Sequence, residues 1–363
     1  MDITVGRETQ EKLQLAMDAM LGVREALADR NVRPFRGPRE AYTWITGDQD
    51  FQTDRGGFYR TSEAIATSDF PNILLNSMTK KLIQDYAALG MGGMERLFTS
   101  TRLGDFKTQD RVRMGYLGDL AAVAEAGPYA EITKPTDEKI SYAPSKFGGL
   151  LTISEETIRN DDLGKIANFP SRLARAGRRT LKQFITDFFV NNPNYDPDTV
   201  AWFHATHANL GSVALSSAEL DAREVALMTQ TEKDSGKALG LPLQWIMVPP
   251  ALKATAFQIN NNDDGTNSWF SRLGVVNNGQ APAGIIVNEL LSDANDWYWG
   301  AFPSEAPFLE IGFLDGIEQP QILLANLATQ GTMFTNDQIQ YKVKFVFGGD
   351  IIDFRPVGKN VVP

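Results

Sequence analysis

Cysteine is absent from this chain of 363 residues, and histidine occurs only twice. The first absence excludes disulfide bonds and thiolate metal sites, and the second leaves few conceivable catalytic triads. No segment reaches the roughly 18 uninterrupted apolar residues that a membrane-spanning helix needs, and the first residues lack the pattern of an export signal. The formal net charge of −10 excludes general nucleic-acid binding, so any such contact must be local.

What is present is typical of a folded globular protein. Hydrophobic residues make up 42% of the chain and charged residues 22%, which is an ordinary balance. A chain of this length buries a substantial core and is long enough for two or three lobes.

An extended hairpin is the most informative pattern. Apolar and polar residues alternate over 129–134 and again over 139–143, and a polar tip at 135–138 separates the two runs. A two-stranded ribbon is marginally stable in water on its own, and its edges invite pairing with other chains. We therefore predict that the hairpin lies on another copy of the chain, as in an assembly subunit.

A long helix with a basic face follows the hairpin. Ser154 is the predicted N-cap of a short helix that ends near Asn160, and a longer helix is predicted over about 166–191. One side of it carries an apolar stripe, formed by Leu173, Gly177, Leu181, Phe184 and Phe188. The opposite side carries five basic residues: Arg172, Arg175, Arg178, Arg179 and Lys182. This basic face either lies in solvent or meets phosphate or a neighbouring subunit's carboxylates.

The remaining patterns indicate mixed helix and strand. Helices are predicted over 7–29, from Ser68 onward, over 218–231 and over 251–259, and an irregular arginine-rich stretch covers 31–39. Strands are predicted over 243–248, 284–288, 297–300 and 339–347, the last broken by Gly348-Gly349 before 351–355.

No pattern amounts to an active site. His204 and His207 have the spacing of a metal pair, but they lack the glutamate and helical setting of a zinc protease, and loop histidines bonded to the backbone are the other interpretation. The polar run 260–265 favours a turn over a calcium loop, and the glycines of 90–93 favour a loop over a phosphate cradle. We expect no catalytic residue, no cofactor and no metal.

The order of elements and four local phrases resemble a known family. The phrases are TSDFPNIL at 67–74, ISEETIRNDD at 153–162, HATHANL at 204–210 and DWYW at 296–299. From about Thr61 to the C-terminus the chain resembles the tailed-phage major capsid proteins of the Hong Kong 97 type, especially the branch of Mu-type head subunits.

This resemblance implies an α+β fold, the Hong Kong 97-type major capsid fold, with six successive segments. They are an N-terminal arm (1–60), a first part of the peripheral domain (61–117), an extended loop hairpin (118–150), a peripheral segment with the spine helix (151–215), an axial domain (216–328) and returning peripheral strands (329–363).

The implied function is structural and not enzymatic. The chain would form pentamers and hexamers of an icosahedral bacteriophage head around double-stranded DNA, located in the virion and assembled in the host cytoplasm. Further partners would be a portal and a decoration or scaffolding protein, with no membrane. The loop residues expected to contact a neighbouring subunit are Lys134, Pro135, Asp137, Glu138 and Lys139. The basic face of the long helix would lie toward the packaged DNA.

Three alternatives remain open at this stage. An encapsulin-type nanocompartment shell has a related fold, although such chains generally lack so long a leading arm. A metal-dependent enzyme would use His204 and His207. Some relatives also join a loop lysine to an asparagine near the C-terminus, for which Lys134 or Lys139 and Asn360 are the candidates.

Overall fold

The computed structural model describes most of the chain. The described ranges are 3–29, 32–46, 69–115, 136–160, 163–260, 284–324 and 338–363, together with positions 120, 122, 123, 125, 127 and 129. The chain divides into two compact units, of which unit 1 comprises Met1–Leu89, Lys146–Thr180 and Ile317–Val346, and unit 2 comprises Gly90–Ser145, Leu181–Gly316 and Phe347–Pro363. The boundaries predicted at 216 and 328 do not coincide with these units, so the axial domain stays a prediction. None of the described helices combines the length and apolar character that a bilayer span requires.

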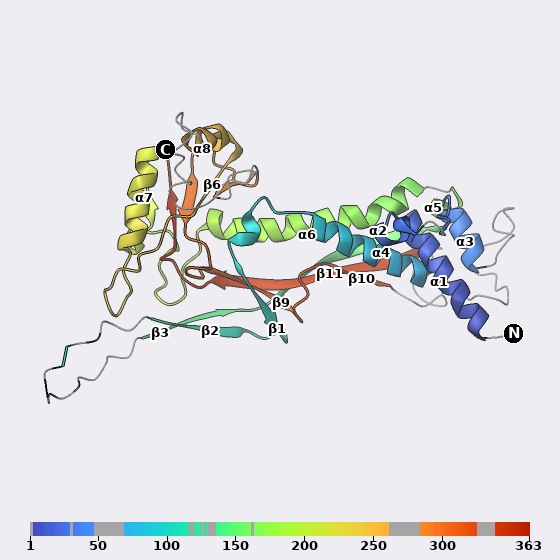
Figure 1. The fold of residues 1–363 in the computed structure, drawn as a ribbon, viewed down its shortest axis with the longest axis horizontal. Coiled ribbons are helices and arrows are strands. Elements are labelled where there is room, and N and C mark those ends of the chain that lie inside the picture. The colour runs from blue at the N-terminus through green and yellow to red at the C-terminus, as the bar shows by residue number, and fades with distance from the viewer. Residues whose placement is uncertain are drawn as a thin grey trace. The chain divides into compact units, whose positions relative to one another are not determined.

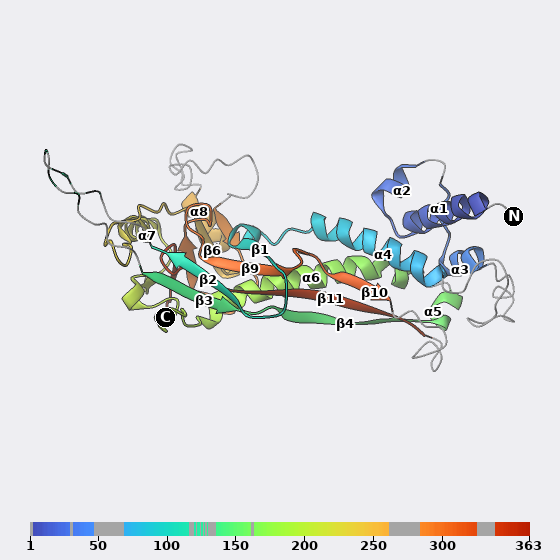
Figure 2. The same cartoon turned by 90° about the horizontal axis from the view of Figure 1, so that it is seen from below.

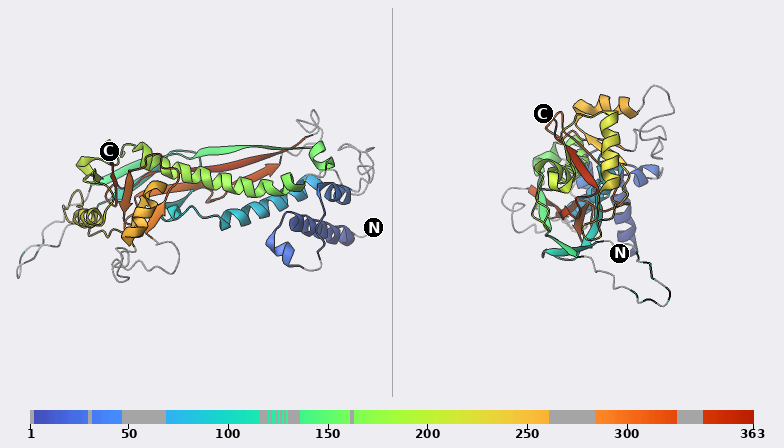
Figure 3. Two further views of the ribbon diagram at one scale, coloured as in Figure 1. Left: turned by 90° about the horizontal axis from the view of Figure 1, so that it is seen from above. Right: turned by 90° about the vertical axis from the view of Figure 1, so that its left-hand side faces the viewer.

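Four helices from the first part of the chain pack on one another in unit 1 (Figure 3). They are α1 (Ile3–Met20), α2 (Arg24–Ala28), α3 (Pro38–Thr46) and α4 (Asp69–Ala88). The single helix predicted over 7–29 is wrong, because Gly22 has a φ of +81° and turns the chain between α1 and α2. Pro38 opens α3, where its missing N–H leaves no helical bond unmade.

The N-terminal helices share a core with α4. Leu13 and Met17 of α1 and Tyr42 of α3 are buried together with Leu74 and Met78 of α4. Burial of such side chains stabilises each by about 1.5–3 kcal/mol. Where it is described, the segment predicted as an arm is therefore packed into its own chain.

A buried carboxylate also joins α1 to α4. Asp18 is 2% exposed, and it accepts hydrogen bonds from Gln14 Nε2 at 2.9 Å, Ser77 Oγ at 2.5 Å and Lys80 Nζ at 2.6 Å. These donors compensate the loss of hydration that a buried charge would otherwise suffer.

Strands β4 (Ser145–Ser154), β10 (Gln321–Leu324) and the first part of β11 (Gln338–Ile351) form the sheet of unit 1. β10 runs antiparallel to β11, with Ile322 opposite Val343, and β4 also pairs with β11. Figure 2 shows β10 and β11 with α4. Ile322 of β10 and Tyr341 of β11 belong to the same core as α4, and the Tyr341 hydroxyl donates to the Pro71 carbonyl at 3.2 Å.

Helices α5 (Glu155–Arg159) and α6 (Leu163–Asn191) follow β4. The Ser154 cap is confirmed, since its hydroxyl accepts from the Thr157 N–H at 3.3 Å. α6 ends where predicted, before Asn192 with its φ of +49°. It begins earlier than predicted and contains Pro170.

Within unit 1, α6 approaches its neighbours closely at Gly177. A Cβ there would lie 2.4 Å from Pro320 Cγ and 3.4 Å from Tyr86 Cε2. Glycine is therefore required by space rather than by backbone conformation.

In unit 2, the end of β11 pairs with β9 (Leu309–Leu314), which runs parallel to β1 (Thr99–Leu103). The break predicted at Gly348-Gly349 is wrong, because β11 continues to Ile351. A Cβ on Gly348 would lie 2.4 Å from the Ala143 carbonyl oxygen, and one on Gly349 would lie 2.3 Å from that of Glu310. The two glycines allow backbones to pack closely.

The second sheet of unit 2 has the order β5-β12-β8-β6-β7. Its strands are β5 (Leu210–Gly211), β6 (Trp245–Val248), β7 (Ile285–Val287), β8 (Trp297–Gly300) and β12 (Val357–Asn360). The strands predicted over 243–248, 284–288 and 297–300 are confirmed. Trp245, Trp297 and Trp299 are at most 1% exposed, so aromatic side chains dominate this core.

Short helices complete unit 2 (Figure 1). They are η2 (Met94–Arg96), η3 (Ala205–His207), α7 (Ser217–Thr229), η4 (Pro250–Leu252) and α8 (Lys253–Asn260). The helices predicted over 218–231 and 251–259 are confirmed. The glycine-rich segment 90–93 is a loop, as predicted, with Gly92 and Gly93 at positive φ.

A two-stranded ribbon is the third sheet. β2 (Gln109–Met114) pairs antiparallel with β3 (Asp137–Tyr142), and Val112 lies opposite Lys139. The strand predicted near 139–143 is confirmed, and 109–114 is its partner among the described residues. The predicted pairing with 129–134 is not tested. Residues 130–135 lie outside the described ranges.

Candidate functional site

The ribbon has one buried and one exposed face. On β3, Glu138, Ile140 and Tyr142 are buried, whereas Asp137 and Lys139 are exposed. On β2, Val112 is 59% exposed and Met114 69%. Alternate residues of the two strands thus form one face packed on the rest of unit 2 and one face open to contact.

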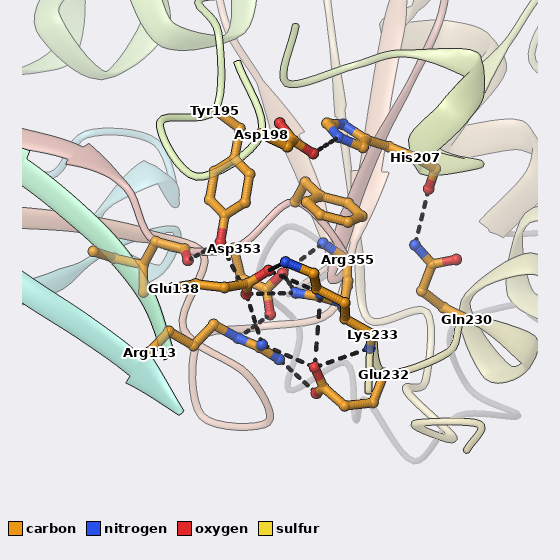
Figure 4. A network of polar contacts seen from close by, with 12 residues as sticks. Arg113, Glu138, Tyr195, Asp198, His207, Gln230, Glu232, Lys233, Asp353 and Arg355 are labelled. Atoms are coloured by element: carbon orange, nitrogen blue, oxygen red, sulfur yellow. Dashed lines mark hydrogen bonds and ion pairs between the residues drawn. The ribbon is translucent and has the colours of Figure 1, made fainter. Parts of the chain in front are cut away.

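Five charged side chains, two of them from the ribbon, gather beside its strands (Figure 4). We call Arg113, Glu138, Glu232, Asp353 and Arg355 the ionic cluster. Its side chains are between 1% and 13% exposed. Lys233 lies at its edge, with Nζ 4.0 Å from Glu138 Oε1 and its side chain 53% exposed. Three acidic and three basic groups therefore meet at one place.

Arg113 of β2 is the central donor of the ionic cluster. Its Nη1 lies 3.0 Å from Glu138 Oε2 and 3.0 Å from Glu232 Oε1, and its Nη2 lies 2.7 Å from Glu232 Oε2. Its Nε lies 2.8 Å from Asp353 Oδ2. All three guanidinium nitrogens are engaged, which the rigid planar fork of arginine permits and a lysine could not reproduce.

Arg355 is the second donor. Its Nη1 lies 2.9 Å from Asp353 Oδ1 and 3.3 Å from Glu138 Oε2. Its guanidinium carbon also lies 4.5 Å from the centre of the Phe354 ring. Arg355 Nε is buried without a hydrogen-bond partner among the described residues.

Burial and the opposite charges have opposing effects on the pKa values in the ionic cluster. Burial alone would lower the pKa of Arg113, but Glu232, Asp353 and Glu138 outweigh it and the pKa of Arg113 is raised. Burial alone would raise the pKa of Glu232, but the hydrogen bond and charge of Arg113 and the charge of Arg355 bring it below the ordinary value. Burial does raise the pKa of Asp353, against the opposing charges of Arg355 and Arg113.

A buried tyrosine supports the same cluster. The Tyr195 hydroxyl lies 3.2 Å from Glu138 Oε2 and 3.2 Å from the Ile352 carbonyl oxygen. Burial, followed by the charges of Asp353 and Glu138, raises the pKa of Tyr195, so the hydroxyl remains a donor.

Two further contacts hold the ends of the ribbon. Arg111 Nε lies 2.5 Å from Glu310 Oε1, and the Tyr142 hydroxyl donates to the same carboxylate. Thr136 is the residue before β3, and its N–H and its hydroxyl each donate to Asp234 at 2.6 Å. The ribbon is thus attached within unit 2 through both of its strands.

The histidines have structural roles. His207 is 3% exposed, with Nδ1 3.0 Å from the Trp202 carbonyl oxygen and Nε2 2.8 Å from Asp198 Oδ2. His204 Nδ1 accepts from the Thr206 N–H at 3.1 Å. The interpretation as loop histidines bonded to the backbone is confirmed. In the described part of the chain, no group of three or more acidic or histidine side chains is arranged to hold a metal ion.

The basic face of α6 is smaller than predicted. Arg172, Arg175 and Arg179 are exposed, as expected. Arg178 instead lies over the Tyr86 ring at 3.9 Å and donates to the Tyr86 carbonyl. Lys182 is 8% exposed, and its Nζ lies 2.5 Å from Glu289 Oε2.

The predicted loop contacts also divide. Asp137 and Lys139 lie on the exposed face of the ribbon, where Lys139 Nζ is 2.9 Å from Asp110 Oδ2. Glu138 points to the opposite face and belongs to the ionic cluster, so its carboxylate is used within its own chain. Lys134 and Pro135 lie outside the described residues.

Asn360, the candidate for a covalent bond, is fully buried in β12. Its Oδ1 accepts from Trp299 Nε1 at 3.0 Å, and its Nδ2 donates to the Val213 carbonyl at 2.9 Å and to Glu219 Oε1 at 3.0 Å. The amide is therefore occupied by partners in its own chain.

Sequence reasoning missed four members of the ionic cluster: Arg113, Glu232, Asp353 and Arg355. The available signal was the pair of charged residues in the otherwise apolar run 351–355. Charged side chains are rarely buried without a partner, but the sequence does not name that partner.

Comparison with known proteins gives a family match. A model of a family described as phage capsid protein matches residues 137–360, which is more than half of the chain. The matched range includes every member of the ionic cluster except Arg113. No curated protein matches the chain.

Solved structures of low sequence identity are also similar. One, from Microbacterium phage Oxtober96, is 14% identical with a TM-score of 0.49, covering 76% of this chain and 92% of that chain. A second, the capsid of a native GTA particle, is 13% identical with a TM-score of 0.46, covering 75% and 91%. A third, from Mycobacterium phage Bobi, is 14% identical with a TM-score of 0.45, covering 75% and 90%. The family match alone carries the assignment.

Proposed function

This chain belongs to the phage capsid protein family and is a subunit of a phage head shell, and from that premise we propose that it builds pentamers and hexamers of an icosahedral head. The family match is the observation that carries this proposal. The family is structural, its fold is the mixed helix-and-strand architecture described above, and its place is the virion. The encapsulin-type compartment is not favoured by this match.

The exposed face of the ribbon supports contact with a neighbouring copy. Val112 and Met114 expose apolar side chains there, next to the charged Asp137 and Lys139. Apolar groups flanked by charges are typical of a contact surface between proteins. We assign Asp137 and Lys139 to this surface, together with Lys134 and Pro135 from the connecting segment, and leave Glu138 to the ionic cluster.

The finer family assignment is the Mu-type branch of the Hong Kong 97 type. It rests on the four phrases at 67–74, 153–162, 204–210 and 296–299. Under it, residues 216–328 form the axial domain around the local symmetry axes, α6 is the spine helix of the peripheral domain, and 118–150 form the extended loop. Assembly takes place in the host cytoplasm, with a portal and a decoration or scaffolding protein as partners.

Negative-stain electron microscopy of the expressed chain tests the assembly proposal. Closed, icosahedral particles are expected. A compact monomer that persists in sedimentation experiments at high concentration would overturn it. Packaged nucleic acid in purified particles would agree with a phage head, whereas a packaged enzyme would point to the storage compartment.

The packaged double-stranded DNA is the proposed ligand of the exposed arginines on α6. The side chains of Arg172, Arg175 and Arg179 are exposed on one side of the helix. There they can contact DNA phosphates without reading the base sequence. Because the whole chain carries a net charge of −10, such contact must be confined to this face. It would hold DNA weakly and in a salt-dependent manner.

Replacing all three arginines by glutamine tests this contact. Phage particles assembled with that variant should retain less nuclease-protected DNA, and the difference from the unaltered chain should shrink as salt rises, because salt weakens the contact that the variant lacks. A control variant removes three exposed basic side chains outside α6: Arg33, Arg36 and Lys253. Equal DNA content in both variants would show that the α6 face is merely solvated.

A further inference from the structure

The ionic cluster lies at the point where the ribbon strands lead into the connecting segment. Arg113 directly precedes Met114, the last residue of β2, and Glu138 directly follows Asp137, the first residue of β3. Met114 and Asp137 are paired with each other. The segment 115–136 therefore leaves and rejoins the ribbon at a residue pair next to the ionic cluster.

The other members of the ionic cluster come from the body of unit 2. Asp353 and Arg355 lie between β11 and β12, and Glu232 follows α7 in a turn closed by the Thr231–Ala238 bridge. The Glu232 N–H donates to the Lys237 carbonyl at 2.9 Å, and the Glu232 carbonyl accepts from the Gly236 N–H at 2.9 Å. The backbone position of Glu232 is therefore held by hydrogen bonds within its own turn.

The guanidinium group of Arg113 fixes the direction of the ribbon relative to those partners. It meets three carboxylates through three different nitrogens, so it cannot rotate about its axis without losing at least one short contact. An apolar contact of the same area would hold the ribbon without preferring one angle, because hydrophobic burial is non-directional.

The energetic argument points the same way. Buried ion pairs replaced by well-packed apolar residues often leave stability unchanged or improve it, since desolvation offsets the Coulomb attraction. The three acidic and three basic groups balance, and removing Arg113 together with Glu232 would leave them balanced. Attachment alone therefore does not require these charges.

We propose that the ionic cluster is a positioning device that fixes the direction of the β2–β3 ribbon and so selects which shell the subunits close. This inference rests on the proposed function for its second half. Closed shells require each subunit to meet its neighbours at set angles, and the ribbon carries the surface assigned to such a contact. Arg113 and Glu232 are thus positioning residues.

The decisive variant carries Arg113→Met and Glu232→Met together. Methionine is close in length to both side chains and fills irregular space. A second variant, Arg113→Lys, keeps the positive charge but loses the fork. Arg33→Gln is the matched control. It removes an arginine of unit 1 whose Nη2 lies 3.3 Å from Glu40 Oε1 in an exposed ion pair.

The first measurement uses the unassembled subunit and does not depend on shell formation. Because the chain has no cysteine, Val112→Cys on the ribbon and Val225→Cys on α7 place two spin labels at exposed positions of unit 2. Unaltered and control subunits should give one narrow distance distribution. The double variant should give a broadened or shifted distribution while unfolding at nearly the same temperature.

An unchanged distribution in a folded double variant would overturn the proposal. If the double variant does not fold, Arg113→Lys is tested by the same measurement. A broadened distance distribution is expected, and an unchanged distribution would refute the proposal.

The second measurement is the diameter of assembled particles by electron microscopy. Unaltered and control chains should give one diameter, whereas the folded ionic-cluster variants should give several diameters or open sheets. A loosened ribbon with unchanged shells would refute the selection of shell geometry only. If the unaltered chain forms no shells, the proposed function fails, while the spin-label result still tests the direction of the ribbon.

Discussion

Asp350 offers a quantitative test of electrostatics in unit 2. It lies in β11 opposite Glu310 of β9. Burial, with a smaller contribution from the charge of Asp196, raises the pKa of Asp350 to about 6, although the Ile351 N–H donates to its Oδ1 at 2.7 Å. Ionisation of Asp350 at neutral pH therefore destabilises the folded state of unit 2.

The sign of the pH dependence follows from this shift. An unfolded aspartate has a pKa of about 3.9, so between about pH 4 and 6 the folded state binds the proton more tightly. The stabilisation is fully present below about pH 4 and is lost as pH rises through 6. At about 1.36 kcal/mol per pKa unit, the ionised side chain costs about 2–3 kcal/mol at neutral pH.

Asp350→Asn should remove that cost and keep the acceptor for the Ile351 N–H. The variant should be more stable than the unaltered chain by up to about 2–3 kcal/mol at pH 7.5. The advantage should shrink by about 1.4 kcal/mol at pH 5, where the unaltered side chain is mostly protonated in the folded state. Urea unfolding of the unassembled subunit, followed by tryptophan fluorescence, measures both differences.

Asp221→Asn is the control, because it removes the same charge from an exposed position on α7. A stability difference for Asp350→Asn that is equal at pH 5 and pH 7.5 would refute the reasoning, since a purely steric or packing effect has no proton linkage.

Three further predictions concern packing, capping and covalent bonding. Gly358→Ala would place a Cβ 2.1 Å from Trp299 Cζ2, so it should destabilise the subunit by about 1–3 kcal/mol or more in urea unfolding; unchanged stability would contradict the packing of β12. Ser154→Ala should cost about 1 kcal/mol in the same assay because it removes the cap of α5, and Ser154→Gly should cost less. The Asn360 amide is occupied within its own chain, so assembled particles should give a single band near 40.1 kDa on a denaturing gel; a ladder of multiples would show inter-subunit cross-links.

Local patterns predicted many elements of the fold. The strand at 243–248, the helix at 218–231 and the end of α6 follow from periodicity, turn residues and caps, which act within a few residues of each other. The predictions failed where a distant contact decides the outcome. Gly348-Gly349 has the sequence of a strand break, yet it lies in a continuous strand because two other backbones approach it closely.

The hairpin illustrates the same limit. Alternation marks a strand but does not name its partner, and the charged residues Asp110, Arg111 and Arg113 hide the strand character of β2. The Arg113 side chain is only 13% exposed because carboxylates from three distant segments surround it. No local pattern brings residues 113, 138, 232 and 353 together, so the ionic cluster could be found only in the structure.

The basic helix shows what this limit does to a functional hypothesis. A helical projection places all five basic residues on one side, but long side chains bend toward partners beside the helix. Arg178 reaches the Tyr86 ring and Lys182 reaches Glu289, so both have structural roles. The proposed DNA contact therefore rests on Arg172, Arg175 and Arg179. Changing Arg178 or Lys182 should lower stability before it lowers DNA retention, which separates the two roles on one helix.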